Sequence, residues 1–280
     1  MSLFTEIGRI QNAKTSIKTA IENKGVEVGD GLIDTYASKI DKILASDEER
    51  LEIKDASYLF YNGARVDAMN ELIKSISDDC ISFSNMYYSC KTLTEFPSLN
   101  TGNGESFSNM YYSCNNCQYY PLIDTKNGKT FASMHAANTK IVESPAYNTS
   151  NGETFNSMFE YCNYIVTIPE LDFGKANRVN SIFSNCLRLE NIGGFKDLGK
   201  GYTQKSNNYS YYKLDLSVAT KLTHDSLMNV INNLYDLNLS YDVANGGTLY
   251  TQQLVLGTTN MAKLTADEIA IATNKGWVVS

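Results

Sequence analysis

Residues 82–105 read SFSNMYYSCKTLTEFPSLNTGNGE, and residues 106–129 read SFSNMYYSCNNCQYYPLIDTKNGK. The apolar residues of this stretch recur at intervals of 24 residues as far as Lys200. They form five columns, whose members are Phe83, Phe107, Phe131, Phe155 and Val179; Met86, Met110, Met134, Met158 and Ile182; Cys90, Cys114, Asn138, Cys162 and Cys186; Leu93, Cys117, Ile141, Ile165 and Leu189; and Pro97, Pro121, Pro145 and Pro169. A fixed period of about 20–50 residues predicts a solenoid, in which each coil buries its apolar edge against its neighbours.

Each unit of the repeat is expected to contain three parts. Residues 83–90 place apolar side chains at steps of three, one and three, which is typical of one face of a short helix. Residues 93–97 end in a proline, which biases the preceding residue towards extended backbone. The Asn-Gly pair at 103–104, which returns at 127–128 and 151–152, predicts a turn. We therefore expect a short helix, a short strand and a glycine turn in each coil.

The pattern [FV]-x-x-[MI]-[YF]-x-x-C-x-x-L-x-x-x-P-x-[LI] resembles the BspA-type leucine-rich repeats, whose signature places a Met-Phe pair, a Cys and a Leu in the same order. The resemblance covers residues 83–195 well and 52–82 weakly, and the sequence departs from it at Cys117, His135 and Asn138. It implies a right-handed α/β solenoid that binds proteins or glycans at surfaces, and it implies no enzymatic activity. The expected fold class is α/β, a leucine-rich-repeat-like solenoid of 24-residue coils with a short helical N-terminal segment and a strand–helix C-terminal cap.

Three domains are expected from these patterns. Residues 1–48 form an N-terminal helical segment, 49–200 the solenoid, and 201–280 the C-terminal cap. The first helix carries an apolar stripe at alternating steps of mostly four and three, made of Leu3, Ile7, Ile10, Ile17 and Ile21. Such a stripe favours a facing helix, so it is a candidate for docking or for a homo-oligomer. The alternative is a helical hairpin that packs on itself or on the repeat.

The two ends of the solenoid have their own signals. Phe60 takes the place that Tyr87 holds later, but the step between them is longer than the period of the other units, as in an atypical capping repeat. Residues 66–73 have helical spacing and are expected to close this end. At the other end, Thr265 and Glu268 predict a capping box before the last helix, and Trp277 begins an expected final strand.

Composition excludes several classes of function. The formal net charge of −7 argues against a nucleic-acid groove, which needs clustered Lys and Arg. No apolar run approaches the roughly 18–20 residues of a membrane span, so no membrane insertion is expected. The N-terminus lacks the pattern of a secretory signal, which predicts folding in a cytosol with the six cysteines reduced.

Few residues suggest covalent chemistry. Cys114 and Cys117 form a C-x-x-C pair, but both fall on repeat columns and no second pair completes a zinc site. His135 stands in the aromatic column, which favours a packed side chain over a catalytic base. The sequence therefore predicts no catalytic residue, no metal site and no cofactor.

Tyrosine is the compositional exception, with 19 residues. An aromatic ring with a polar tip suits recognition surfaces because it loses little conformational entropy on binding. The candidate ligand-binding residues are Tyr88, Tyr112, Tyr119, Tyr120, Tyr202, Tyr209, Tyr211 and Tyr212. The alternative is that these side chains are scattered on the surface or pack between subunits.

The organisation of a short helical start, a repeat array and this C-terminal cap resembles bacteriophage virion proteins of the tail, baseplate or capsid-fibre kind. The resemblance implies a non-enzymatic structural and binding protein, assembled into a virion in the host cytoplasm. Its partners would be other virion proteins, or a glycan or protein of the host cell surface. The alternative is an adhesin-like leucine-rich-repeat protein at a bacterial surface. A third class, an enzyme such as a depolymerase, would need paired carboxylates in a cleft.

Overall fold

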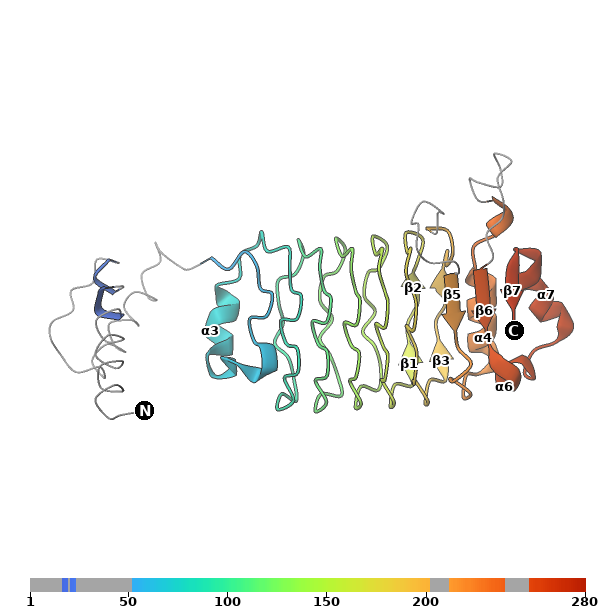
Figure 1. Ribbon diagram of the computed structural model, residues 1–280, viewed down its shortest axis with the longest axis horizontal. Helices are drawn as coiled ribbons and strands as arrows, with labels where there is room; N and C mark the ends of the chain where they lie inside the picture. The colour runs from blue at the N-terminus through green and yellow to red at the C-terminus, as the bar shows by residue number, and fades with distance from the viewer. Residues whose placement is uncertain (1–16, 20, 24–51, 202–211, 240–251) are drawn as a thin grey trace, which may run out of the picture. The chain divides into compact units, whose positions relative to one another are not determined.

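Successive repeat units pair in parallel, each shifted from the last by one period of the sequence. Backbone bridges join Ser82 to Ser106, Ser106 to Thr130, Thr130 to Thr154, and Thr154 to Arg178. Each position therefore meets its own counterpart one unit later, so that the columns of the sequence become rows of neighbouring side chains. Figure 1 shows these units side by side between α3 and the strands of the C-terminal part.

The computed structural model describes residues 17–19, 21–23, 52–201, 212–239 and 252–280. The chain divides into two compact units, Met1–Glu52 and Ile53–Ser280. Of the first unit, residues 17–19 and 21–22 are described as helical. The second unit contains the repeats and both of their ends.

The first part of each repeat is a series of tight turns. We call residues 82–90 and their counterparts 106–114, 130–138, 154–162 and 178–186 the turn runs. Asn85 and Ser89 have φ angles of 57° and 58°, and the equivalent residues of the later units are also left-handed. A continuous right-handed helix cannot include such residues. The helix expected at residues 83–90 is therefore wrong.

Hydrogen bonding explains why the turn runs are not helical. The N–H groups of Phe83, Asn85, Tyr87 and Ser89 donate to carbonyl groups of the next unit over 2.7–2.9 Å. The N–H groups between them, such as that of Met86, donate three residues back within the same unit. Every second backbone N–H group of these turn runs therefore donates a hydrogen bond to the next unit instead of to its own. The spacing of three, one and three still puts Phe83, Met86, Tyr87 and Cys90 on the buried side.

The second part of each repeat is extended. We call residues 93–99 and their counterparts 117–123, 141–147, 165–171 and 189–195 the extended runs. The expected strands form only in the later units, where β1 (Thr167–Ile168) pairs with β3 (Asn191–Ile192) and β2 (Leu171–Asp172) pairs with β4 (Phe195–Lys196). Pro169 falls between β1 and β2, where its missing N–H interrupts the pairing.

The core lies between the turn runs and the extended runs. Phe83 stacks on Phe107 with ring centroids 5.7 Å apart, and Tyr87 stacks on Tyr111 at the same distance. Phe96 of the extended run contacts Tyr87 at 4.9 Å, which joins the two layers. These rings are almost fully buried. Each contributes about 1.5–3 kcal/mol of hydrophobic stabilisation.

The N-terminal end of the repeats is closed by short helices: η1 (Tyr61–Gly63), η2 (Val66–Ala68) and α3 (Met69–Lys74). The helix expected over residues 66–73 is confirmed, as η2 followed directly by α3. Phe60 stacks on Tyr87 with centroids 5.2 Å apart, which confirms the longer step between the first unit and the second.

The C-terminal end combines a three-stranded parallel sheet with helices. The sheet has the order β5 (Tyr212–Asp215), β6 (Gln252–Val255) and β7 (Trp277–Val279). The helical elements are α4 (His224–Asn233), η3 (Leu237–Leu239), α6 (Gly257–Met261) and α7 (Ala266–Asn274). The expected capping box of Thr265 and Glu268 is present at the start of α7, and Trp277 begins the final strand as expected.

These findings describe a stack of repeat units with short helices and small parallel sheets. The assignment of that stack to the leucine-rich-repeat-like solenoids, and the domain boundaries at 48 and 200, stay predictions. Among the described residues, none of the helices is long and apolar enough to span a membrane.

Candidate functional site

Three tyrosines form a stacked row on the outward side of the turn runs, which we call the turn face. The Tyr61 and Tyr88 rings lie 4.8 Å apart with an interplanar angle of 13°, and the Tyr88 and Tyr112 rings lie 4.6 Å apart at 4°. Tyr58 leans on Tyr61 at 5.5 Å and is 56 % exposed. The expected candidates Tyr88 and Tyr112 are therefore brought together, side by side and half-buried.

The row follows from the register of the units. Tyr88 and Tyr112 are one period apart, and Tyr61 precedes Tyr88 by the same longer step that relates Phe60 to Tyr87. Tyr58 and Tyr61 were missed by the sequence analysis, although this step could have found Tyr61. The same position is occupied by Ala136 and Glu160 in the next units, so the aromatic row ends after Tyr112.

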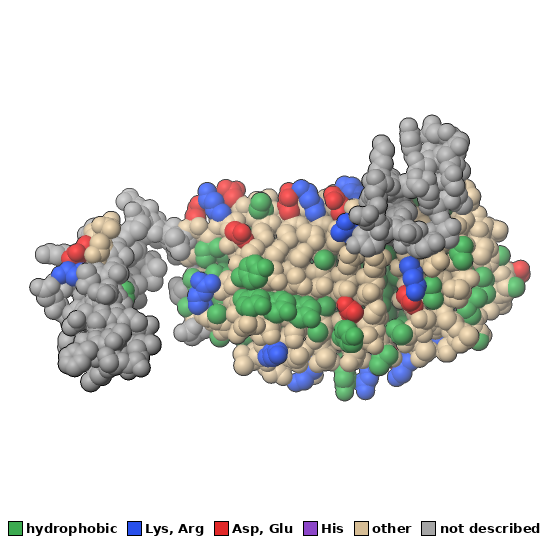
Figure 2. Space-filling model, viewed as in Figure 1, with side chains coloured by type: hydrophobic (Ala, Val, Ile, Leu, Met, Phe, Trp, Pro, Cys, Tyr) green, Lys and Arg blue, Asp and Glu red, His purple; other side chains and the backbone are tan. Residues whose placement is uncertain are grey.

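Hydrophobic side chains form a row along the stack on the face shown in Figure 2, and charged side chains gather at its edges. Several ion pairs belong to the turns that join one unit to the next. Lys129 pairs with Glu105 at 2.7 Å, and Lys126 pairs with Asp124 at 3.2 Å. The charges of these turns are thus largely matched within the protein.

Tyr119 and Tyr120 belong to an extended run, on the other side of the core. Tyr119 is 70 % exposed. Tyr120 is only 8 % exposed, and its hydroxyl group donates to the carbonyl oxygen of Cys114 over 3.2 Å. Its ring packs against Phe96 and His135. Tyr120, a candidate ligand-binding residue in the sequence, thus shares the buried column of Phe96, while Tyr119 points outward.

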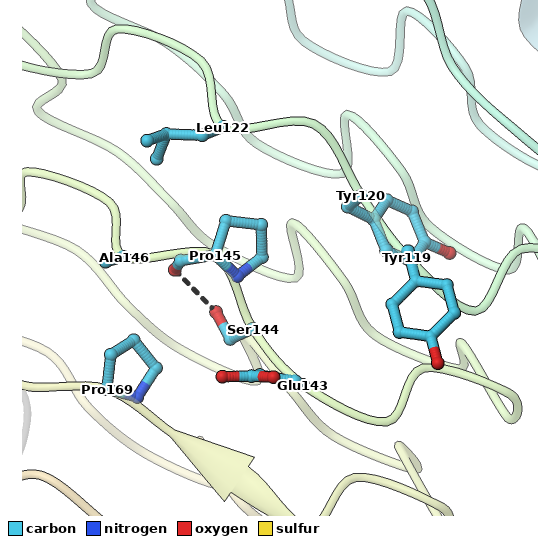
Figure 3. A pocket seen from close by; sticks show the side chains of 8 residues that line it. All are labelled: Tyr119, Tyr120, Leu122, Glu143, Ser144, Pro145, Ala146 and Pro169. Carbon is cyan, nitrogen blue, oxygen red and sulfur yellow. Dashed lines mark hydrogen bonds between the residues drawn. The ribbon is translucent and has the colours of Figure 1, made fainter.

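An open hollow of about 320 Å³ lies beside Tyr119 (Figure 3). Its lining comes from three successive extended runs and consists of Tyr119, Tyr120, Leu122, Glu143, Ser144, Pro145, Ala146 and Pro169. We call this outward side of the extended runs the proline face, after Pro97, Pro121, Pro145 and Pro169. Leu122 is 69 % exposed at the rim, so the hollow offers apolar surface to an incoming group.

A second hollow of about 390 Å³ continues along the proline face to α4. Pro169 lines both hollows. Its lining includes the polar side chains of Asn191, Thr223, Asp225 and Asn229. The proline face is therefore indented over several successive units.

Several expected residues cannot be placed. Tyr202, Tyr209 and Tyr211 lie outside the described residues, as do Leu3, Ile7 and Ile10 of the apolar stripe. The backbone of Tyr212 begins β5 and pairs with Gln252, and its side chain is not among those described. Within the first unit, Ile21 is 3 % exposed and Ile17 is 39 % exposed.

The cysteines are buried thiols. Cys114 donates to the carbonyl oxygen of Tyr87 over 3.0 Å, and Cys162 donates to that of His135 over the same distance. Cys117 donates to the carbonyl oxygen of Tyr119, and burial raises the pKa of its thiol to about 11. Because the thiolate is the reactive form, these groups are held inert at neutral pH. The described residues contain no group of three or more His, Cys, Asp or Glu side chains that could hold a metal ion.

The two histidines have opposite surroundings. His135 is fully buried between the Tyr111 and Phe159 rings, and burial lowers its pKa to about 3. His224, at the start of α4, lies 2.8 Å from a carboxylate oxygen of Glu268, and this hydrogen bond raises its pKa. Both histidines thus serve packing or the joining of helices in the described part of the chain.

No family model, curated protein or solved structure matches this chain.

Proposed function

We propose that this protein is a non-enzymatic structural and binding protein of a bacteriophage virion. The N-terminal unit docks or oligomerises, and the stack of units presents a surface to virion partners or to the host cell. The observation that carries the binding role is the stacked row of Tyr61, Tyr88 and Tyr112, together with the exposed Tyr119 and Leu122 beside the hollow.

Exposed aromatic rings on a rigid backbone support a binding role for a physical reason. The turn runs that carry Tyr88 and Tyr112 are fixed by hydrogen bonds to the next unit, so these tyrosines are held in place before a partner arrives. A pre-organised surface loses little conformational entropy on binding. Apolar surface that is exposed in rows is also typical of interaction sites.

The direct test is the composition of particles. Virions purified from the bacterium whose DNA carries this gene, after induction, are analysed by mass spectrometry of tryptic peptides. The proposal expects peptides of this chain at a fixed ratio to the known capsid proteins. Peptides that remain in the cell-surface fraction and are missing from the particles would overturn the virion role and support the adhesin-like alternative.

A second measurement addresses the binding surface. The double variant Tyr88→Ser and Tyr112→Ser is compared with a control, Tyr161→Ser, which removes a tyrosine that is 51 % exposed outside the stacked row. Binding of the purified protein to the host cells or to stripped particles is expected to fall in the double variant alone. Equal binding by the double variant and the unaltered protein would remove the row from the site.

A further inference from the structure

The extended runs carry acidic side chains and no basic ones. Their five segments contain four glutamates, while Lys, Arg and His are absent from them. The glutamates are Glu95, Glu143, Glu170 and Glu190. The proline face therefore has a uniform sign of charge, in contrast to the turns at the edges, where lysines alternate with carboxylates.

Two of these carboxylates, Glu95 and Glu143, form no ion pair within the part of the chain that the structure describes. The ion pairs of that part use other acids, such as Glu105, Asp124 and Asp172. Glu143 lines the hollow directly and is exposed. Asp225 of α4, which lies 3.5 Å from His224, has a side chain that is 98 % exposed and lines the second hollow.

The most exposed aromatic ring of this face stands between two of the acids. Glu95, Tyr119 and Glu143 follow one another at one period each and so occupy the same position in three successive units. With units about 4.8 Å apart, the two glutamates are about 10 Å from each other on either side of the tyrosine. Leu122 and Pro145 supply apolar surface next to them (Figure 3).

A ring flanked by unpaired carboxylates fits a cation. A guanidinium or ammonium group over a tyrosine ring is attracted by the negative face of the ring. The planar guanidinium group can also donate paired hydrogen bonds to a carboxylate, and its side-chain methylenes can cover apolar surface. An uncharged sugar could stack on the ring but would leave the glutamates without a charge partner.

We propose that the proline face binds a basic, extended segment of a partner protein, with an Arg or Lys side chain over Tyr119 and paired with Glu143 or Glu95. A segment in the extended polyproline II conformation has three residues per turn and advances about 3.1 Å per residue, so cations three residues apart would lie on one side and about 9 Å apart, close to the spacing of the two glutamates. The proposal rests on the proposed binding function and specifies the chemistry of the partner.

The test uses the full chain and a synthetic peptide. A fluorescent peptide of Gly and Ser with Arg at every third position is titrated with the protein, and the change in anisotropy is measured at low salt. The matched peptide has citrulline in place of Arg, which keeps the shape and removes the charge. We expect the Arg peptide to bind at least about tenfold more tightly, and its affinity to fall as salt is raised.

Variants locate the binding. Tyr119→Ala and Glu143→Gln are each expected to weaken binding about two- to fivefold, in line with an exposed cation–π contact or ion pair. Tyr119→Phe keeps the ring and is expected to restore affinity. Tyr161→Ala and Glu160→Gln, which alter a tyrosine and a glutamate of a turn run, serve as matched controls and are expected to change nothing.

Three results would overturn the proposal: equal affinity for the citrulline peptide, equal losses in the turn-run controls, or competition by an oligosaccharide of N-acetylglucosamine whose own binding depends on Tyr119. The last result would assign the face to a glycan. Failure here is distinct from failure of the virion role, because the particle composition is measured without the peptide. A chain that is absent from virions could still bind the Arg peptide.

Discussion

Two tyrosines of the buried aromatic column have hydroxyl groups without a hydrogen-bond partner among the described residues. They are Tyr87 and Tyr111, and both side chains are fully buried. Burying a hydroxyl group without a hydrogen bond costs about 1–3 kcal/mol. The same column contains phenylalanine in later units, at Phe159 and Phe183, where this cost does not arise.

Tyr87→Phe is therefore expected to leave the free energy of unfolding unchanged or to raise it by up to about 1 kcal/mol. The matched variant is Tyr147→Phe, whose hydroxyl group lies 3.0 Å from Nε2 of His135. Loss of this hydroxyl group should lower the free energy of unfolding by about 1–3 kcal/mol, because the buried Nε2 atom of His135 is left without a hydrogen-bond partner. Urea unfolding of both proteins measures the difference. Similar losses in the two variants would contradict this assignment and indicate a bound water at Tyr87.

His135 makes the stability of the protein depend on pH. Its pKa is about 3 in the folded protein, because burial disfavours the charged ring, and about 6.5 in an unfolded chain. The unfolded state therefore binds the proton more readily as pH falls. The contribution of His135 is fully present above about pH 6.5 and decreases by up to about 1.4 kcal/mol per pH unit between about 6.5 and 3.

His135→Phe is expected to flatten the pH dependence in this window, because a phenyl ring can stack between Tyr111 and Phe159 without titrating. Urea midpoints at pH 7.5, 6 and 5 compare the variant with the unaltered protein. His224→Gln is the control, because His224 contributes a pH dependence of stability opposite in sign to that of His135. The pKa of His224 is raised by its hydrogen bond to Glu268, so its contribution is lost as pH rises through that pKa. Parallel pH profiles for His135→Phe and the unaltered protein would contradict the assignment.

At the scale of the element, the columns predicted the buried side chains better than the backbone. Phe83, Met86, Tyr87 and Cys90 are buried as expected, since a fixed period places equivalent positions in register whatever the local backbone. The helix at 83–90 could not be distinguished from successive turns, because both present residues at steps of three and four on one side. The difference depends on which unit accepts each N–H, and that is a tertiary property.

The sequence predicted which tyrosines reach the surface better than it predicted the side of the core on which each one lies. Tyr88, Tyr112 and Tyr119 lie at the surface, but on two sides of the core. In an extended run successive side chains alternate between the inside and the outside of the stack. Adjacent residues therefore differ in burial, and Tyr119 is exposed where Tyr120 is buried. The charge of the proline face was visible in the sequence only once the five extended runs had been placed side by side.

The glycine turns illustrate a requirement of packing. A Cβ atom on Gly128 would lie 2.4 Å from Cζ of Phe131, and the equivalent distance at Gly104 is 2.6 Å to Phe107. These glycines are not among those with a positive φ. They are needed because the ring of the next turn run lies directly against the backbone.

Gly128→Ala is expected to lower the free energy of unfolding by about 1–3 kcal/mol, because the buried Phe131 ring has to move. The control is Gly102→Ala, in a position where the nearest atom would be a carboxylate oxygen of Asp124 at 3.3 Å, on a side chain that can shift. Thermal unfolding followed by circular dichroism compares the two. Equal losses would mean that the ring contact is not the cause.

At the scale of the whole molecule, the chain has two compact units, and the boundary between them in the sequence follows Glu52. The apolar stripe of the first unit is the feature that predicts an oligomer. Light scattering of the full chain is expected to give a particle of more than one copy, and a chain that starts at Ile53 is expected to be a monomer. A full-length variant with Ile10→Asp and Ile17→Asp should behave as the shortened chain. The same number of copies in all three proteins would contradict a role of the stripe in assembly.

The hydrogen bonds between turn runs also make the stack electrically directional. In the four turn runs that begin at residues 82, 106, 130 and 154, four peptide groups direct N–H towards the following unit and C=O towards the preceding one. A peptide group has a dipole of about 3.5 D, and dipoles aligned head to tail add together, as they do in a helix. The turn runs thus act as four parallel rows of dipoles, with the positive pole towards the C-terminal cap. The short helices at the N-terminal end and the C-terminal cap therefore cover poles of opposite sign.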